Sequence, residues 1–169
     1  RVALDRRGES WTKVVEDVEN RKVIDIEIVE DGTDQVVLAA SDDKSGANLG
    51  TVHRSTDGGA TWAASTGGLP SAFRLPRLCA FPAAPQTLFM SAVAGSGGAA
   101  FRTDDGGASW SATGWTSPQW QYDIACDPLE PDTLYVAGFG STPVQRSTDA
   151  GISFANYSNG LENAGTPNT

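Results

Sequence analysis

The residues of this chain best suited to chemistry are its aspartates, and two of them, Asp104 and Asp105, are adjacent. Glycosidases use two carboxyl groups, one as a general acid and the other as a nucleophile or base. Asp105, however, is one of three aspartates that recur in the same short motif, together with Asp57 and Asp149. A reaction needs one site rather than three, so this recurrence favours a structural role for Asp105.

The motif has the pattern Ser/Thr, any residue, Asp, any residue, Gly, any residue, Ser/Thr, aromatic, and its aspartates are spaced 48 and then 44 residues apart. It reads STDGGATW, TDDGGASW and STDAGISF, and an arginine precedes each copy. A degenerate copy is expected near the start, where Gly8 and Trp11 keep the spacing but Arg6 replaces the aspartate. The recurring positions are Ser55, Asp57, Gly59 and Trp62; Thr103, Asp105, Gly107 and Trp110; and Ser147, Asp149, Gly151 and Phe154.

A tight hairpin explains why the motif has these residues. The turn leaves backbone N–H groups without strand partners, and an aspartate side chain can accept several of them, while glycine supplies a positive φ. The aromatic residue begins the next strand, and its burial contributes about 2–3 kcal/mol in transfer terms. The motif therefore predicts a hairpin stabilised by its own side chains.

Short β-prone runs with alternating apolar residues lie upstream of each motif. In the first repeat they predict strands near 23–29, 35–40, 50–55 and 61–66, and the pattern is repeated twice more. Four strands per repeat are typical of a β-propeller blade. The sequence therefore predicts an all-β fold of antiparallel β-propeller blades, about three blades plus an N-terminal remnant.

The repeats also predict the organisation of the chain. We expect 1–20 to end a preceding blade, 21–70, 71–116 and 117–160 to form blades, and 161–169 to lead to a missing blade. Closed propellers need about four to eight blades, so we expect an incomplete propeller of about six to eight blades. Its open edges would be covered by the remaining blades of a longer chain or by self-association.

At these motifs the sequence resembles the Asp-box, or BNR-repeat, β-propeller superfamily. Its members include sialidases, xyloglucanase-type glycoside hydrolases, sortilin-type receptors and photosystem II assembly factors. The resemblance implies that the hairpins lie on the outer rim and that the first strand of each blade lines the channel. It also implies that the connections between blades and those between the second and third strands share the face that binds ligands.

Aligning the repeats places Asp25, Arg77 and Asp123 at equivalent, channel-side positions of the predicted first strands. Such charges could bind a polar ligand, or they could pair with one another in a solvated channel. The run Phe73-Arg74-Leu75-Pro76 resembles the Phe/Tyr-Arg-Ile-Pro motif of sialidases, and this implies that Arg74 binds a carboxylate. The rest of the sialidase pattern, including a tyrosine and glutamate pair for catalysis, is not identifiable.

The predicted connection before the third blade contains Trp115 and Trp120. These could form a platform for a sugar ring, or they could fill the seam between blades. His53 is expected to be packed or solvated, because no partner marks it as a base. Asp42 and Asp43 are a poor Ca²⁺ cage, so we expect neither a metal nor a cofactor.

Two cysteines, Cys79 and Cys126, are far apart in the sequence, and we expect them to be free, half-buried thiols. Twelve basic and twenty-one acidic residues give a net charge of −9, which disfavours nucleic acid as a partner. No apolar run approaches membrane-spanning length, and we expect this segment to contain no cationic-then-apolar leader. We expect an extracellular or periplasmic location for the protein to which this segment belongs.

Two classes of function remain open. The first is a non-catalytic binding or scaffold segment that presents its strand ends and loops to a protein, peptide or glycan. The alternative is part of a glycoside hydrolase, xyloglucanase-like or sialidase-like, whose active site is completed by blades absent here. The second class would gain support if Asp25 and Asp123 faced one cleft.

Overall fold

The computed structural model describes residues 21–31, 34–43, 50–118, 120–140 and 142–161. Within these ranges all the regular structure is β-strand, arranged in three four-stranded antiparallel sheets. The predicted remnant at 1–20 and most of the predicted linker at 161–169 lie outside the described residues. The all-β class and the four-stranded repeats predicted from the sequence are confirmed.

Each sheet is a meander in which consecutive strands pair. The first contains β1 (Arg21–Asp31), β2 (Asp34–Asp43), β3 (Thr51–Ser55) and β4 (Ala63–Ala64). The second contains β5 (Phe73–Phe81), β6 (Ala84–Ala94), β7 (Gly97–Thr103) and β8 (Ser111–Ser117). The third contains β9 (Gln121–Cys126), β10 (Leu134–Gly138), β11 (Val144–Ser147) and β12 (Ala155–Asn156).

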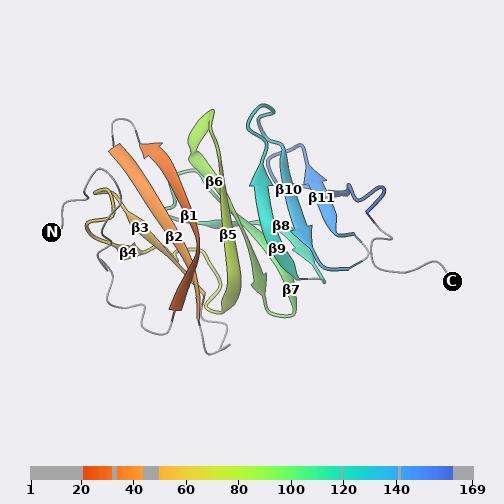
Figure 1. Ribbon diagram of the computed structural model, residues 1–169, viewed down its shortest axis with the longest axis horizontal. Coiled ribbons are helices and arrows are strands. Elements are labelled where there is room, and N and C mark those ends of the chain that lie inside the picture. Colours follow the sequence, from red (N-terminus) through yellow and green to blue (C-terminus); the bar gives the residue numbers. More distant parts are fainter. Residues whose placement is uncertain (1–20, 32–33, 44–49, 119, 141, 162–169) are drawn as a thin grey trace, which may run out of the picture.

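The sheets stand next to one another in chain order, and β5 packs between β1 and β9 (Figure 1). One apolar core fills the seam between the first and second sheets, where Leu38 and Val52 meet Leu78 and Met90. Another core joins the second and third sheets through Cys79, Phe81, Phe89, Ile124 and Leu134. Each sheet is therefore a blade that buries apolar side chains against the adjacent sheet, and we call the sheets blades 1, 2 and 3.

The recurring motifs form the turns between the third and fourth strands, and we call these turns the Asp hairpins. In blade 1, Asp57 accepts hydrogen bonds from the backbone N–H and the hydroxyl of Thr61, at 2.8 and 2.6 Å. The hydroxyl of Ser55 donates to Asp57 at 2.8 Å and accepts from the N–H of Gly59 at 2.8 Å. The same bonds recur around Asp105 and Asp149.

These bonds change the acidity of the aspartates. The side-chain hydrogen bond from Thr61, followed by the backbone bond from Thr61 and the side-chain bond from Ser55, lowers the pKa of Asp57 to about 2. The corresponding bonds from Ser153 and Ser147 lower the pKa of Asp149 to about 2. At Asp105, desolvation by burial acts in the opposite direction, but bonds from Ser109 and its neighbours outweigh it, and the pKa falls to about 2. All three aspartates are stabilised as acceptors rather than held ready to transfer protons.

The blade 2 hairpin also packs against the outer edge of blade 1. The Nε atom of Arg54 donates to the carbonyl oxygen of Gly106 at 2.9 Å, and Trp110 donates from its indole to Ser65 at 3.0 Å. The Ser65 hydroxyl donates in turn to the carbonyl of Gly107. Arg54 and Trp110, which occupy two of the repeated positions, therefore form hydrogen bonds that join blade 1 to blade 2.

Cys79 and Cys126 form a disulfide that joins β5 of blade 2 to β9 of blade 3, with a Cα–Cα distance of 5.6 Å. The prediction of free thiols is wrong. Their separation of 47 residues is close to one repeat, so the two cysteines lie on strands that are neighbours in space although distant in sequence. A search for close pairs in the sequence cannot detect this relation.

Candidate functional site

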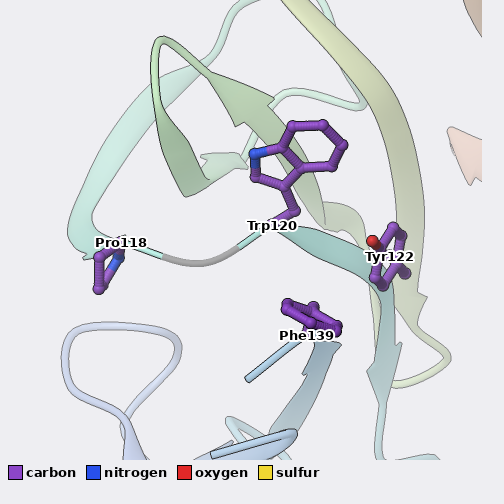
Figure 2. A pocket seen from close by; sticks show the side chains of 4 residues that line it. All are labelled: Pro118, Trp120, Tyr122 and Phe139. Atoms are coloured by element: carbon purple, nitrogen blue, oxygen red, sulfur yellow. The ribbon is translucent and has the colours of Figure 1, made fainter. Parts of the chain in front are cut away.

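An open hollow of about 470 Å³ lies where blade 3 begins, and we call it the Trp120 hollow. It is lined by Pro118, Trp120, Tyr122 and Phe139 (Figure 2). Pro118 and Trp120 belong to the connection between β8 and β9, and Tyr122 lies in β9. Phe139 follows β10 directly. The hollow is therefore formed by the connection from blade 2 to blade 3 together with the connection between β10 and β11, the second and third strands of blade 3.

The backbone holds the two sides of the hollow together. The N–H of Phe139 donates to the carbonyl of Trp120 at 2.9 Å, next to a register shift between Ala137 and Gly138. A Cβ atom on Gly138 would lie 2.7 Å from the same carbonyl, so the close approach requires glycine. The glycine thus allows Trp120 and Phe139 to flank one space.

The aromatic side chains of this hollow are unusually exposed. Trp120 is 41%, Tyr122 47% and Phe139 70% accessible. Single exposed apolar residues are common, but a contiguous group of large ones marks an interaction surface. The three rings are therefore suited to cover an apolar ligand.

Arg74 lies beside the hollow, with its guanidinium carbon 4.1 Å from the centroid of the Trp120 ring. Within the part of the chain that the structure describes, this ring is its one recorded partner, and no hydrogen bond or ion pair engages it. The next residue, Leu75, has a φ of 52°, in the left-handed region, and β5 shifts register between Arg74 and Arg77. A bulge of this kind redirects side chains.

Asp25 and Arg77, two of the charges expected to line a channel, are engaged in the seam between blades 1 and 2. Asp25 accepts from the N–H groups of Ile26 at 2.9 Å and Leu78 at 2.7 Å. Arg77 donates to the carbonyl of Ile24 at 2.7 Å. These contacts tie β1 to β5.

Asp123, the equivalent residue of blade 3, is exposed and accepts from the N–H of Ile124 at 3.0 Å. It borders a hollow of about 70 Å³ that Tyr135 and Val144 also line. Asp25 instead bonds into the seam with blade 2, and β5 stands between β1 and β9. The carboxylates of Asp25 and Asp123 therefore lie in different surroundings, one in the seam between blades 1 and 2 and the other beside the small hollow of blade 3.

Trp115, on β8, lies in the seam between blades 2 and 3. Its indole N–H donates to the side-chain oxygen of Gln145 at 3.1 Å, and its ring packs on Phe154 with centroids 4.8 Å apart. Trp115 is not among the residues that line the hollow with Trp120. The two tryptophans of the expected platform therefore have different environments.

Three lining residues of the hollow, Pro118, Tyr122 and Phe139, were not singled out in the sequence. The run Gly138-Phe139-Gly140 was the available signal, because a bulky aromatic between two glycines in a loop has few neighbours to cover it. The structure also places Glu27, half-buried, in a cleft with Phe81 and Pro82 between β1 and β5. Burial first, and the charge of Asp25 second, raise the pKa of Glu27.

The remaining candidate ligands give no metal site. Asp42 and Asp43 are buried at the end of β2, where Asp42 accepts from the N–H of Asp43 at 3.0 Å. Among the described residues, no group of three or more His, Cys, Asp or Glu side chains could hold a metal ion. No helix in the same residues is long and apolar enough to cross a membrane.

Comparison with known proteins gives similarity at the level of structure. No protein-family model matches the chain, and no curated protein is similar to it. YCF48 bound to D1 peptide superposes with a TM-score of 0.58 and 18% identity, over 80% of this chain and 40% of that one. A GH74 enzyme of Niastella koreensis gives 0.65 and 17%, over 85% of this chain and 24% of that one.

These similarities define the class of protein: the chain folds as blades of a β-propeller. It spans less than half the length of either chain, 40% and 24% respectively. At identities of 17–18%, the likeness shows the fold alone. Function has to be argued from the site.

Proposed function

We propose that this chain is a non-catalytic binding segment of a β-propeller and that it holds a peptide segment of a partner protein in the Trp120 hollow. The observation that carries the proposal is the convergence of three exposed aromatic side chains, Trp120, Tyr122 and Phe139, around one space. One of the similar structures is a propeller described as bound to a peptide, which supports a ligand of this kind.

The hollow suits a peptide in size and chemistry. Its volume of about 470 Å³ falls in the range of sites that enclose small ligands, about 300–1,000 Å³. An extended segment could place one or two apolar side chains against the rings, with its backbone reaching solvent. Tyrosine and tryptophan bind well at such surfaces because they offer a large apolar area together with a polar group.

The non-catalytic part of the proposal rests on the acidic residues. A glycosidase needs two carboxyl groups on either side of one sugar linkage. Asp25 is engaged by two backbone N–H groups, and the Asp hairpins hold Asp57, Asp105 and Asp149 as ionised acceptors. None of these aspartates lines the Trp120 hollow.

The second candidate is a segment of a glycoside hydrolase whose active site is completed by other blades. The exposed rings of Trp120 and Tyr122 favour it, because the C–H faces of a sugar pack well on aromatic rings. The GH74 enzyme among the similar structures is consistent with this alternative. The hollow would then be a sugar subsite rather than a peptide site.

The proposal also covers the group of propellers to which the chain belongs, the number of blades and the location of the protein. The Asp hairpins support membership of the Asp-box group of propellers, and about six to eight blades would complete the ring, from a longer chain or from further copies. The disulfide between Cys79 and Cys126 supports an extracellular or periplasmic location, because disulfides persist in oxidising compartments.

A double substitution of Trp120→Ala with Phe139→Ala tests the proposal. The matched control is Ile152→Ala, which removes another exposed apolar side chain, 73% accessible, from the blade 3 hairpin. Each variant is screened against an array of random hexapeptides and an array of plant and bacterial oligosaccharides. Peptide binding lost in the double variant and kept in the control supports the proposal, whereas binding confined to the oligosaccharides moves the function to the second candidate.

A further inference from the structure

Blade 1 and blade 3 lie at opposite ends of the molecule, and each has one face turned away from blade 2 (Figure 1). In blade 3, the side chains of Ile124 and Leu134 enter the core shared with blade 2. Side chains alternate along a strand, so the residues beside them point to the other face, which we call the outer face of blade 3. This outer face bears a small hollow of about 70 Å³, and its side chains are Asp123, Ala125, Tyr135, Ala137, Val144 and Arg146.

Arg146 holds a buried donor on this outer face. Its Nε is buried and has no hydrogen-bond partner in the part of the chain that the structure describes. The guanidinium carbon lies 5.8 Å from the ring centroid of Tyr135 and 5.4 Å from that of Tyr157, so both rings attract its charge. A buried N–H that has lost water without gaining an acceptor costs free energy. An acceptor brought by a partner would remove that cost.

Arg54, the equivalent residue of blade 1, shows which acceptor fits. Its Nε donates at 2.9 Å to the carbonyl oxygen of Gly106. Gly106 is the fourth residue of the blade 2 motif, at the turn of the Asp hairpin. The repeated arginine of one blade can therefore bond to the hairpin backbone of the blade that packs on it.

Blade 2 departs from this arrangement for a reason that the sequence makes plain. Arg102 forms an ion pair at 2.8 Å with Asp104, the second residue of its own motif. Blades 1 and 3 have threonine at that position, Thr56 and Thr148, so the same ion pair cannot form there. Arg146 is therefore expected to bond to a neighbouring hairpin, as the arginine of blade 1 does.

A second contact recurs in both described seams. A Cβ atom on Gly107 of the blade 2 hairpin would lie 2.6 Å from Leu38, and one on Gly151 of the blade 3 hairpin would lie 3.0 Å from Phe89. Leu38 and Phe89 each pair across the strands with the repeated arginine of their own blade. Each seam thus places a hairpin glycine against the residue beside that arginine. On the outer face of blade 3 the corresponding residue is Tyr135.

Blade 1 presents the complementary features on its face turned away from blade 2. Among the described residues, a Cβ atom on Gly59 would meet only Trp62, at 3.5 Å, so this hairpin glycine presses on no neighbouring blade. Ile26 and Ile28 alternate with Val29 of the core and are each 57% exposed. Two large apolar side chains on one strand face mark a surface suited to packing.

We propose that the outer face of blade 3 binds blade 1 of a second copy of this chain, with the Nε of Arg146 donating to the carbonyl oxygen of Gly58. Gly58 is the fourth residue of the blade 1 motif, as Gly106 is of the blade 2 motif. The ring of Tyr135 would lie against Gly59, and the two isoleucines would cover the alanines of the outer face. The contact would continue the seam geometry already present between blades 1 and 2.

Such a contact joins two different surfaces, so it adds copies head to tail until a ring closes. Three blades per chain make six blades in two copies, within the range of about four to eight for closed propellers. We therefore expect a closed dimer in which each copy uses both of its end faces. This inference rests on the part of the proposed function in which other blades complete the ring, and it names their source; peptide binding at the Trp120 hollow is independent of it.

Sedimentation velocity of the full chain over a wide range of concentration tests the dimer. Arg146→Ala changes the outer face of blade 3, and Ile26→Glu with Ile28→Glu changes blade 1, so each variant is expected to raise the dissociation constant about tenfold or more. Leu129→Glu is the control, because it places the same charge at another exposed apolar residue, 85% accessible, in the turn between β9 and β10. It should dimerise as the wild type does. Thermal melts check that all variants remain folded.

A mixture of the two interface variants separates head-to-tail pairing from other modes of association. The Arg146→Ala copy keeps its blade 1 and the isoleucine variant keeps its blade 3, so one intact contact can form between them. We expect heterodimers at concentrations at which neither variant associates alone. They should be weaker than the wild-type dimer, which closes two contacts.

The outcomes separate this inference from the peptide-binding function. A monomeric wild type, a dimer that neither variant weakens, or a mixture that stays monomeric would each overturn the inference. Binding of hexapeptides to the Trp120 hollow is measured on the same samples. A dimer that binds no peptide would reject the peptide-binding function and support the inference, whereas a monomer that binds peptides would do the reverse.

Discussion

The Nε atom of Arg54 and the carbonyl oxygen of Gly106 are joined by a hydrogen bond of 2.9 Å that crosses from blade 1 to the Asp hairpin of blade 2. Arg102, at the same place in the next repeat, pairs instead with Asp104. Arg146, in the third, lies near the rings of Tyr135 and Tyr157, and its buried Nε has no hydrogen-bond partner in the described residues. The repeated arginine thus has a different environment in each of the three blades.

We expect Arg54→Ala to lower the free energy of unfolding by about 1–2 kcal/mol, because the substitution leaves the buried Gly106 without the partner of its carbonyl. Arg102→Ala is the matched control, since it removes an arginine of the same repeat position from an exposed ion pair, and its cost should stay below about 1 kcal/mol. Urea unfolding of both variants measures the difference. Equal costs would show that the seam bond contributes nothing specific.

Asp105→Asn should weaken the blade 2 hairpin, because an amide accepts the N–H and hydroxyl bonds of Ser109 less well than a carboxylate. The site is largely exposed, so solvent screening limits the expected cost to about 1 kcal/mol at pH 7. Peptide binding at the Trp120 hollow should not change, because Asp105 does not line it. Loss of binding with an unchanged melt would contradict the structural role.

The same hairpin predicts a pH dependence of known sign. The folded pKa of Asp105 is about 2, and an unfolded aspartate titrates near 4, so its contribution is complete above about pH 4 and is lost as the pH falls toward 2. Melts of wild type and Asp105→Asn should therefore converge between pH 4 and 2. Asp104→Asn removes a neighbouring carboxylate whose pKa is lowered by the hydrogen bond from Arg102 rather than by the hairpin, so its difference from wild type should also shrink as the pH falls. A wild-type advantage that persists at pH 2 would refute the assignment.

The sequence predicts the Asp hairpins well because their bonds are local, linking Asp57 only to residues within four positions. It does not predict the disulfide or the hollow, since both depend on which strands become neighbours once the blades stack. Trp115 and Trp120 are equally prominent in the sequence, yet one packs on Phe154 and the other borders the hollow. Which tryptophan is packed and which borders the hollow depends on how the blades pack against one another, and the order of residues along the chain does not show this.

The disulfide between Cys79 and Cys126 is expected to stabilise the pair of blades that it joins. Closing a loop of 47 residues should contribute about 3–4 kcal/mol by restricting the unfolded chain. We therefore expect Cys79→Ser with Cys126→Ser to shift the urea midpoint downward, and dithiothreitol to shift only the wild type. Thiol titration of unfolded, non-reduced protein should find no free thiol, and two free thiols would contradict the bridge.

The equivalent glycines Gly59 and Gly107 of two Asp hairpins should respond differently to the same substitution. Both have positive φ, 86° and 79°, so alanine costs backbone strain of about 1–2 kcal/mol at either position. At Gly59 the new Cβ would meet only Trp62 at 3.5 Å, an ordinary contact. At Gly107 it would lie 2.6 Å from a methyl group of Leu38 in the core of the seam.

Gly107→Ala should therefore destabilise the protein by about 1–3 kcal/mol more than Gly59→Ala, because relieving the clash has to shift the blade 2 hairpin or the packed Leu38 side chain. The double variant Gly107→Ala with Leu38→Ala checks the cause, since the smaller residue removes the obstructing methyl groups. If the clash is responsible, the two changes should cost less together than the sum of their separate effects. Additive costs would mean that the seam does not press on Gly107, and that backbone strain alone accounts for its sensitivity.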